Sequence, residues 1–354
     1  MTEIAQRLRG EIQRRGDISF ADFMRASLYD PEQGYYSQRR PIGKLGDFFT
    51  SVSVGSLFGQ LLAFQIARWI EQMPSGALFQ CVEAGAHDGH LALDILNALQ
   101  ESEPTIFAAL EYWIIEPSPG RREMQEDKLN QFRNVRWFSS MAEIRGLVHG
   151  VIFSNELLDA MPVHIFRWDK SRREWNEMGV NVLNEEFVFV ELPAPTTVEP
   201  KLPEELLHVL PNHYTVELSP GALQWWADAS CALARGRLMT IDYGETFEEA
   251  LSTGRTSGSL RAYSRHRMNP EVLKEPGKQD ITANVNFTEL ELVGQRSGLE
   301  TELFSTQSQF LMRTAHNVWT RNGPFSRQQV RQFQTLTHPE HLGRLFRVFI
   351  QARS

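Results

Sequence analysis

The sequence predicts an α/β protein built on a mostly parallel, seven-stranded sheet, and three observations support this fold class. From residue 78 onward, apolar runs typical of buried strands alternate with segments of helical periodicity. The stretch Phe79–Leu96 joins a strand to a helix through a turn that contains Gly85 and Gly89. Polar residues follow the ends of four expected strands, and open parallel sheets bind their ligands at these ends.

The composition is that of a globular protein and argues against several classes of partner. The net charge of −8 disfavours nucleic acid and anionic membranes. No apolar run reaches the roughly 18 residues that a membrane-spanning helix needs. Two cysteines, Cys81 and Cys231, predict a reducing compartment without a disulfide framework. The N-terminal segment is amphipathic and carries acidic side chains, so we expect a folded helix there rather than a targeting peptide.

Residues 1–77 are expected to form an N-terminal helical cap ahead of the sheet. After the first helix, Ser19 and Asp22 have the spacing of a capping box for a second helix, which should end before Pro31. The run Leu57–Ile70 is dense in apolar residues and predicts a third, well-buried helix.

Residues 78–354 are expected to form the sheet domain. Its expected strands are Leu78–Val82, Tyr112–Ile115, Val135–Phe138, Val151–Ser154, Arg237–Ile241, Thr301–Phe304 and Leu345–Ile350. Its expected helices are Leu91–Leu99, Pro119–Leu129, Met141–Arg145, Ala222–Ala234 and Thr288–Ser297. A β-rich insertion at about 163–213 and a polar, glycine-bearing insertion at about 245–286 interrupt this order.

The polar strand ends indicate the kind of ligand. They are Glu83, Glu116, Asn155 with Glu156, and Asp242. Glu116, at the end of the second strand, can accept hydrogen bonds from both hydroxyls of a ribose. The turn has the spacing E-x-G-x-x-x-G and lacks the middle glycine of the dinucleotide fingerprint, while Asp88 would repel phosphates. A nucleoside without phosphates therefore fits better. S-adenosylmethionine, whose sulfonium is cationic, suits an acidic pocket, and we expect no metal ion.

Ordered motifs along nearly the whole chain resemble one protein family. They are LYDPEQGYYS, GDFFTSVSVGSLFG, IIEPSP, SNELLDAMPV, IDYG, LRAYSRHR, DITANVNF and TQSQFL. The family is that of the MidA-type methyltransferases, which includes a mitochondrial complex I assembly factor that methylates an arginine of its partner subunit. The resemblance implies a class I, Rossmann-like methyltransferase sheet with an N-terminal helical cap and a β-rich insertion, and S-adenosylmethionine as the cofactor.

The resemblance also implies a set of cofactor contacts. The expected cofactor-binding residues are Asp47, Thr50, Ser51, Glu83, Gly85, Gly89, Glu116 and Asn155. The acid and glycines of the turn would shape the pocket around the methionine portion, although a plain strand-to-helix turn would have the same sequence. Asp47, Thr50 and Ser51 could hold the methionine carboxylate or close the site. Alternatively, they form a capping loop for the helix Leu57–Ile70.

Four residues are expected to act on the methyl acceptor: Asn155, Glu156, Asp159 and His266. The segment SNELLDA resembles the acid-bearing loop of arginine methyltransferases, in which a glutamate holds the guanidinium. Arginine presents a planar fork of donors that a carboxylate such as Glu156 can bind in bidentate fashion. Asp159 could be a second acid or a helix cap. His266 or Asp280 could assist proton removal, clamp a peptide backbone, or serve as structural residues.

The sequence departs from the family pattern at a few positions. His87 stands where the family has the middle glycine of its loop, and Asn284 and Asn286 replace a histidine and an aspartate.

We expect an enzyme that methylates a protein arginine and is able to form a homodimer. We expect it in a bacterial cytoplasm, or in the mitochondrial matrix if the protein is eukaryotic. A catalytically weakened assembly protein and a small-molecule methyltransferase are the alternatives.

Overall fold

The computed structural model describes residues 2–37, 50–74, 78–195, 199–252, 255–264, 267–340 and 342–354. These residues form two compact units, each assembled from three segments of the chain. The first unit consists of Met1–Phe48, Asp159–Ala222 and Thr246–Asn284. The second, which we call the sheet unit, consists of Phe49–Leu158, Leu223–Glu245 and Val285–Ser354.

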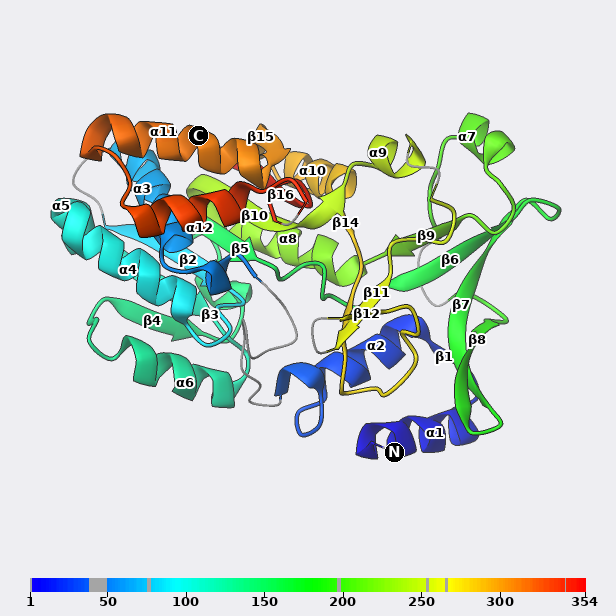
Figure 1. The fold of residues 1–354 in the computed structure, drawn as a ribbon. Coiled ribbons are helices and arrows are strands. Elements are labelled where there is room, and N and C mark those ends of the chain that lie inside the picture. The colour runs from blue at the N-terminus through cyan, green and yellow to red at the C-terminus, as the bar shows by residue number, and fades with distance from the viewer. Residues whose placement is uncertain are drawn as a thin grey trace. The chain divides into compact units, whose positions relative to one another are not determined.

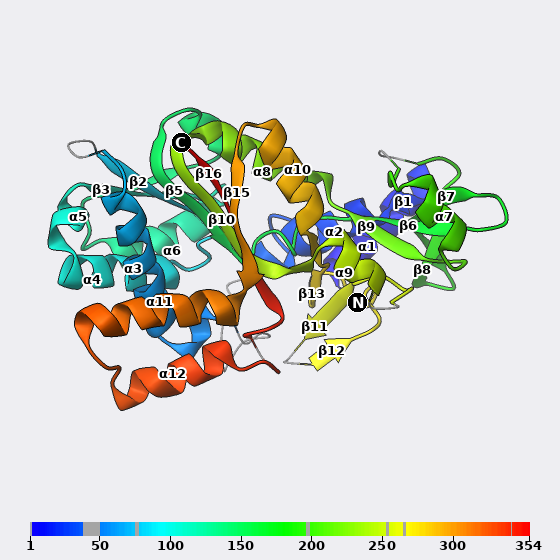
Figure 2. The ribbon, with the colours of Figure 1, turned by 90° about the horizontal axis from the view of Figure 1, so that it is seen from above.

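A mixed sheet of seven long strands lies at the centre of the sheet unit (Figures 1 and 2). Across the sheet the order is β15 (Glu300–Thr306), β16 (Phe346–Arg353), β10 (Leu233–Glu245), β5 (Val148–Asn155), β2 (Phe79–Ala84), β3 (Leu110–Ile115) and β4 (Val135–Phe138). The strands from β10 to β4 pair in parallel, whereas β16 is antiparallel to both of its neighbours. Short β14 (Val285–Asn286) extends the end of β10. The expected α/β class and all seven expected strands are confirmed.

Helices cover both faces of this sheet. One face carries α3 (Leu57–Glu71), α4 (His90–Ser102) and α11 (Gln307–Asn322), with α12 (Arg327–Thr337) packed beside them. Val348 and Ile350 of β16 belong to this apolar cluster, so the residue between them points to the opposite face. That residue, Phe349, stacks on Trp226 of α8 (Pro220–Ala232) and contacts Phe287 of α10 (Phe287–Arg296).

Further helical elements of the sheet unit lie before α3 or between its strands. They are α5 (Pro104–Ala108), α6 (Pro119–Leu129) and the 3₁₀ turns η3 (Val52–Val54) and η4 (Met141–Ile144). The pair α11 and α12 has no counterpart among the helices that the sequence predicts. No helix in the described part of the chain is long and apolar enough to span a membrane.

The first unit combines helices, two of them N-terminal, with antiparallel strands. The helices are α1 (Glu3–Arg15), α2 (Phe20–Tyr29), α7 (Glu204–Val209) and α9 (Phe247–Ser252), with η1 (Tyr35–Ser37). The strands are β1 (Ile18–Ser19), β6 (His164–Asp169), β7 (Glu174–Leu183), β8 (Glu186–Glu191), β9 (Thr215–Leu218), β11 (Arg261–Ser264), β12 (Arg267–Asn269) and β13 (Asp280–Thr282). Ser19 caps α2 as predicted, because its side chain accepts from the N–H of Asp22. The β-rich insertion is also confirmed.

The compact units and the expected cap divide the chain at different places. Helix α3 packs on α4 and the sheet, so it belongs to the sheet unit rather than with α1 and α2. The apolar density of this helix predicts burial, but it does not reveal which core buries it. Both expected insertions lie largely in the first unit.

Candidate cofactor site

The structure brings the predicted polar strand ends to one edge of the sheet unit. Strands β10, β5, β2 and β3 are consecutive neighbours and run in the same direction. Their register aligns Ala84 with both Ile115 and Ser154, and Asn155 with Ile241. Glu116, Asn155 and Asp242 therefore follow strand positions that lie side by side, at the edge where open parallel sheets bind ligands.

The turn after β2 requires glycine at two positions. Gly85 has φ +76°, and a Cβ there would lie 2.9 Å from Leu157 Cδ1. Gly89 has φ +80° and forms the N-cap of α4. Both angles lie in the left-handed region that side chains disfavour. Between them, the non-glycine residue His87 adopts φ +49°. Such backbone conformations are uncommon for residues with a side chain, and they cluster at functional sites.

Asp88 of this turn is surrounded by cationic groups. His90 Nδ1 lies 2.6 Å and Lys128 Nζ 2.7 Å from its carboxylate. Burial opposes ionisation, but the hydrogen bonds from His87, His90 and Lys128 together hold the pKa of Asp88 well below its usual range. The expected repulsion of phosphates is therefore weakened, because Lys128 compensates the charge.

Glu83 is an almost fully buried acid of the site, and its pKa is raised rather than lowered. Only 3% of it is exposed, and the Tyr112 hydroxyl donates to its Oε2 at 2.6 Å. Burial raises the pKa of Glu83 to about 7, the Tyr112 hydrogen bond opposes this rise, and the charge of Asp88 adds to it.

Glu116 is also buried, but its carboxylate accepts hydrogen bonds from a backbone N–H and an amide side chain. The N–H of Ser118 donates to Oε1 at 2.9 Å and Gln125 Nε2 donates to Oε2 at 3.0 Å. Burial raises the pKa of Glu116, while these donors and Arg121 lower it. Each oxygen thus has one protein donor in these bonds and retains acceptor capacity for a ribose hydroxyl.

The loop after β5 holds the predicted substrate residues. Glu156 has φ +53°, its N–H donates to Ile241 O at 2.9 Å, and Asn155 Nδ2 donates to its Oε1 at 3.2 Å. The next two N–H groups, of Leu157 and Leu158, donate to Asp242 Oδ2 at 3.1 and 2.8 Å. Asp242 thereby fixes the loop that carries Glu156.

Thr50 and Ser51 make hydrogen bonds inside the sheet unit. Thr50 and Ser53 exchange backbone and side-chain bonds in a tight turn ahead of α3. Ser51 is fully buried and donates to Gln307 Oε1 at 3.0 Å. These bonds do not involve α3, whose N-cap residue is Ser56, so they do not distinguish a capping loop from a cofactor role, and both stay predictions.

The remaining predicted residues either lie outside the described residues or belong to the first unit. Asp47 and His266 lie outside the described residues. Asp159 and Asp280 belong to the first unit, where both are buried. The Tyr36 hydroxyl donates to Asp280 at 2.8 Å, and burial together with the charges of Asp280 and Asp159 raises the pKa of Tyr36 well above its usual value.

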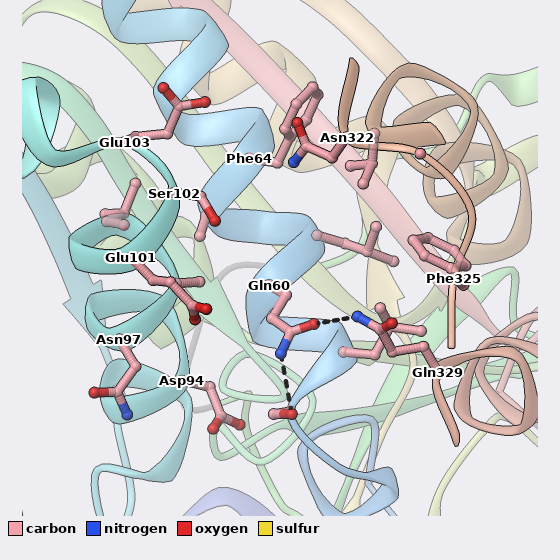
Figure 3. Close-up of a pocket in the computed structure, with 18 of the residues that line it drawn as sticks. Gln60, Phe64, Asp94, Asn97, Glu101, Ser102, Glu103, Asn322, Phe325 and Gln329 are labelled. Carbon is pink, nitrogen blue, oxygen red and sulfur yellow. Dashed lines mark hydrogen bonds between the residues drawn. The ribbon is translucent and has the colours of Figure 1, made fainter. Parts of the chain in front are cut away.

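A separate cavity of about 470 Å³ lies among α3, α4 and the junction of α11 with α12 (Figure 3). It is lined by Asp94, Asn97 and Glu101 of α4, while Gln60 in its wall bonds to Ser56 and Gln329. These α4 residues lie beyond its first turn, away from Gly89, so this cavity is not the strand-end site. No cluster of metal-ligating side chains occurs within the described ranges.

The residues at the strand ends fit S-adenosylmethionine. Glu116 offers carboxylate oxygens to vicinal hydroxyls. A cationic ligand near Glu83 would favour the ionised form of this carboxyl, which burial disfavours. Asn155 Oδ1 is buried without a hydrogen-bond partner among the residues that the structure describes. An unpaired buried acceptor is costly, so a bound donor at this position would be stabilised.

Comparison with known proteins supports this fit. Residues 61–305, more than half of the chain, match the family of S-adenosyl-L-methionine-dependent methyltransferases. The chain belongs to this family. The enzyme is therefore a methyltransferase that uses S-adenosylmethionine, and the expected class I fold and cofactor are confirmed.

Relatives and solved structures agree with this assignment. The methyltransferase is 26% identical to the mitochondrial protein arginine methyltransferase NDUFAF7 of Homo sapiens, over 99% of this chain and 83% of that protein. The Danio rerio protein is 26% identical over 98% of this chain and 86% of its own. A COG1565 superfamily member from Burkholderia thailandensis, bound to S-adenosyl-homocysteine, is 29% identical with a TM-score of 0.82, covering 99% of this chain and 92% of that chain.

Two polar residues that hydrogen-bond to the strand-end acids are absent from the site that the sequence predicts. Tyr112 lies within an apolar strand and contacts Glu83. Gln125 lies on α6 and contacts Glu116. Its spacing of four residues from Leu129, which is also buried, is the signal that could have placed Gln125 on the inner face of this helix.

Proposed function

We propose that this methyltransferase methylates an arginine side chain of a protein, with Asn155 and Glu156 as substrate contacts. The observation that carries the proposal is the conformation of Glu156. A non-glycine residue at φ +53° is strained, and the bonds from its own N–H and from the two following N–H groups hold it there. The NDUFAF7 relatives, named protein arginine methyltransferases, support the same substrate class.

The chemistry assigned to Glu156 follows from the charge of arginine. When bound, S-adenosylmethionine supplies an electrophilic methyl group. The Glu156 carboxylate would accept two N–H donors of the guanidinium and fix its orientation. Because the guanidinium is protonated at neutral pH, the same carboxylate would polarise it as a proton leaves. Asn155, which donates to Glu156, would hold this carboxylate in place.

We assign cofactor binding to the residues of the strand-end edge in the sheet unit. They are Glu83, Gly85, Gly89, Glu116 and Asn155. Asp47, Thr50 and Ser51 remain predicted cofactor contacts, and Asp159 and His266 remain predicted catalytic residues. Asn286, which replaces the family's aspartate, has a structural role that an aspartate could also fill: it caps α10, and its side chain accepts from the N–H of Glu289.

The substitution Glu156→Gln tests the substrate assignment. It keeps the size of the side chain and removes its charge, so methyl transfer should fall at least 100-fold, the upper range for a charge-assisted hydrogen bond. Affinity for S-adenosyl-homocysteine, measured by calorimetry, should stay within twofold of wild type. If Glu156→Gln retains full turnover, Glu156 is not the acceptor contact.

The acceptor class needs a separate experiment. Labelled S-adenosylmethionine is added to cell extract with the enzyme, and the label is followed into protein and into the small-molecule fraction. We expect label in protein, released as methylarginine on hydrolysis. Label confined to small molecules would favour the alternative acceptor class.

For the cellular compartment, we propose a bacterial cytoplasm, whereas the NDUFAF7 relatives are named mitochondrial. A homodimer stays a prediction.

A further inference from the structure

We propose that Gln125 is a positioning residue for the cofactor, because its amide joins the glycine turn to the acid that binds the ribose. The proposal rests on the assignment of Glu116 as the ribose ligand. Gln125 lies on α6, outside every motif that the sequence singles out, and it is fully buried. Burying an amide is costly unless it is hydrogen-bonded, so its partners explain why it is there.

All three partners of Gln125 lie around the proposed site. Its Nε2 donates to His87 O at 2.9 Å and to Glu116 Oε2 at 3.0 Å. Its Oε1 accepts from Trp137 Nε1 on β4 at 3.0 Å. The Gln125 side chain thus fixes both the turn at His87, whose backbone is in the left-handed region, and the Glu116 carboxylate that follows β3.

Trp137 determines which way the amide points. An indole nitrogen only donates, so it selects the amide oxygen of Gln125 and leaves the two N–H donors for His87 O and Glu116. If the amide flipped, its oxygen would face two acceptors at about 3 Å, which is repulsive. The pair Trp137 and Gln125 is therefore an oriented donor for the Glu116 carboxylate rather than a space-filling contact.

A second buried amide in the sheet unit has the same bonding pattern and serves as a matched control. Gln351 of β16 is fully buried and accepts from Trp226 Nε1 at 2.8 Å. Its Nε2 donates to Glu291 O at 3.1 Å and Thr301 Oγ1 at 3.2 Å. These partners lie on α8, α10 and β15, which carry none of the predicted site residues.

The test compares Gln125→Leu with Gln351→Leu, using S-adenosyl-homocysteine as the probe in calorimetry. Both substitutions remove a buried amide and should lower the denaturation midpoint of the ligand-free protein. Gln125→Leu should in addition weaken S-adenosyl-homocysteine binding about 10- to 100-fold, the range for hydrogen bonds to a charged group. Gln351→Leu should leave this affinity within twofold. Equal affinities for the two variants would overturn the proposal.

Two further variants keep the proposal testable if Gln125→Leu does not fold. Trp137→Phe removes the indole N–H that orients the amide, together with part of the ring, and should weaken binding several-fold. Trp226→Phe makes the same change beside Gln351 and should not weaken binding. Gln125→Glu places a second carboxyl beside Glu116, and two such groups share a proton at low pH. Its binding defect should shrink as pH falls from 8 to 5, since the protonated carboxyl can donate to Glu116. A defect that does not change with pH contradicts the positioning role.

Glu116→Ala separates failure of this inference from failure of the proposed site. If Glu116→Ala leaves S-adenosyl-homocysteine affinity unchanged, Glu116 is not the ribose ligand and both proposals fall. If Glu116→Ala weakens binding while Gln125→Leu does not, the site stands and only the role of Gln125 is lost.

Discussion

Glu116 follows the last residue of β3, and Asp242 lies on β10 just beyond its pairing with β5, but their carboxylates have different hydrogen-bond partners. Asp242 is fully buried; its Oδ2 accepts from Leu157 and Leu158, and its Oδ1 accepts from Tyr243 N–H at 2.8 Å. Glu116 accepts one protein donor on each oxygen. Backbone N–H groups therefore occupy much of the hydrogen-bond acceptor capacity of Asp242, whereas Glu116 keeps acceptor capacity for a ligand. A strand-end acid binds ligand only if the fold leaves it acceptor capacity.

Asp242→Ala should have the largest effect on stability. It removes the acceptor of three backbone N–H groups, of which that of Leu158 is buried and the other two are partly buried, and should lower the free energy of unfolding by about 3–5 kcal/mol. Methyl transfer should be lost with it, because the loop that carries Glu156 loses its support. Urea denaturation measures the first effect. A loss under 1 kcal/mol would mean that the loop holds its shape without Asp242.

The pH dependence of stability should separate Glu83 from the other acids. On folding, burial raises the pKa of Glu83 from 4.5 to about 7, so the folded state binds a proton that the unfolded state releases. Its contribution is fully present below pH 4.5 and is lost as pH rises to 7, which corresponds to about 3 kcal/mol.

Glu83→Gln is the control for this contribution. The amide cannot ionise, so the unfolding free energy of the variant should fall less between pH 4.5 and 7 than that of wild type. Chemical denaturation at several pH values measures the difference. Parallel pH profiles for the two proteins would show that Glu83 does not titrate in this range.

Glu116→Ala should act mainly on binding. Loss of the ribose acceptor should weaken S-adenosyl-homocysteine affinity about 10- to 100-fold, equivalent to about 1.5–3 kcal/mol. Stability should change less than in Asp242→Ala, because fewer N–H groups lose their acceptor. Calorimetry and urea denaturation on the same preparation test both halves. A large loss of stability without a binding defect would make Glu116 equivalent to Asp242.

Much of the fold could be predicted because local pattern and burial agree. The apolar runs that became β2, β3 and β5 are central strands buried on both faces, and such strands read as continuous apolar segments. Helix α11 was missed, although Thr306 and Gln309 form a capping box at its start. Its partner α12 is mostly polar, with Leu336 as its one fully buried position, so it offers few apolar residues that would indicate a packed helix.

The candidate site was less predictable than the sheet. The sequence places acids at strand ends, but it does not show which donors reach them. Tyr112 reaches Glu83 from the neighbouring strand and Gln125 reaches Glu116 from the following helix. These contacts depend on register and on helix rotation, which local sequence does not specify. Assigning Asp242 to the backbone likewise required the positions of Leu157 and Leu158.

The substitution Ser51→Ala tests the same distinction between structural and ligand-binding polar groups. Its expected effect is the smallest of those described. The Ser51 hydroxyl is buried and donates to Gln307 Oε1, while Gln307 Nε2 donates to Leu336 O. Ser51→Ala should therefore cost about 1 kcal/mol of unfolding free energy, typical of one neutral hydrogen bond. If the hydroxyl is structural, S-adenosyl-homocysteine affinity should stay within twofold of wild type. A tenfold loss of affinity at unchanged stability would instead establish Ser51 as a cofactor contact, as the family resemblance predicts.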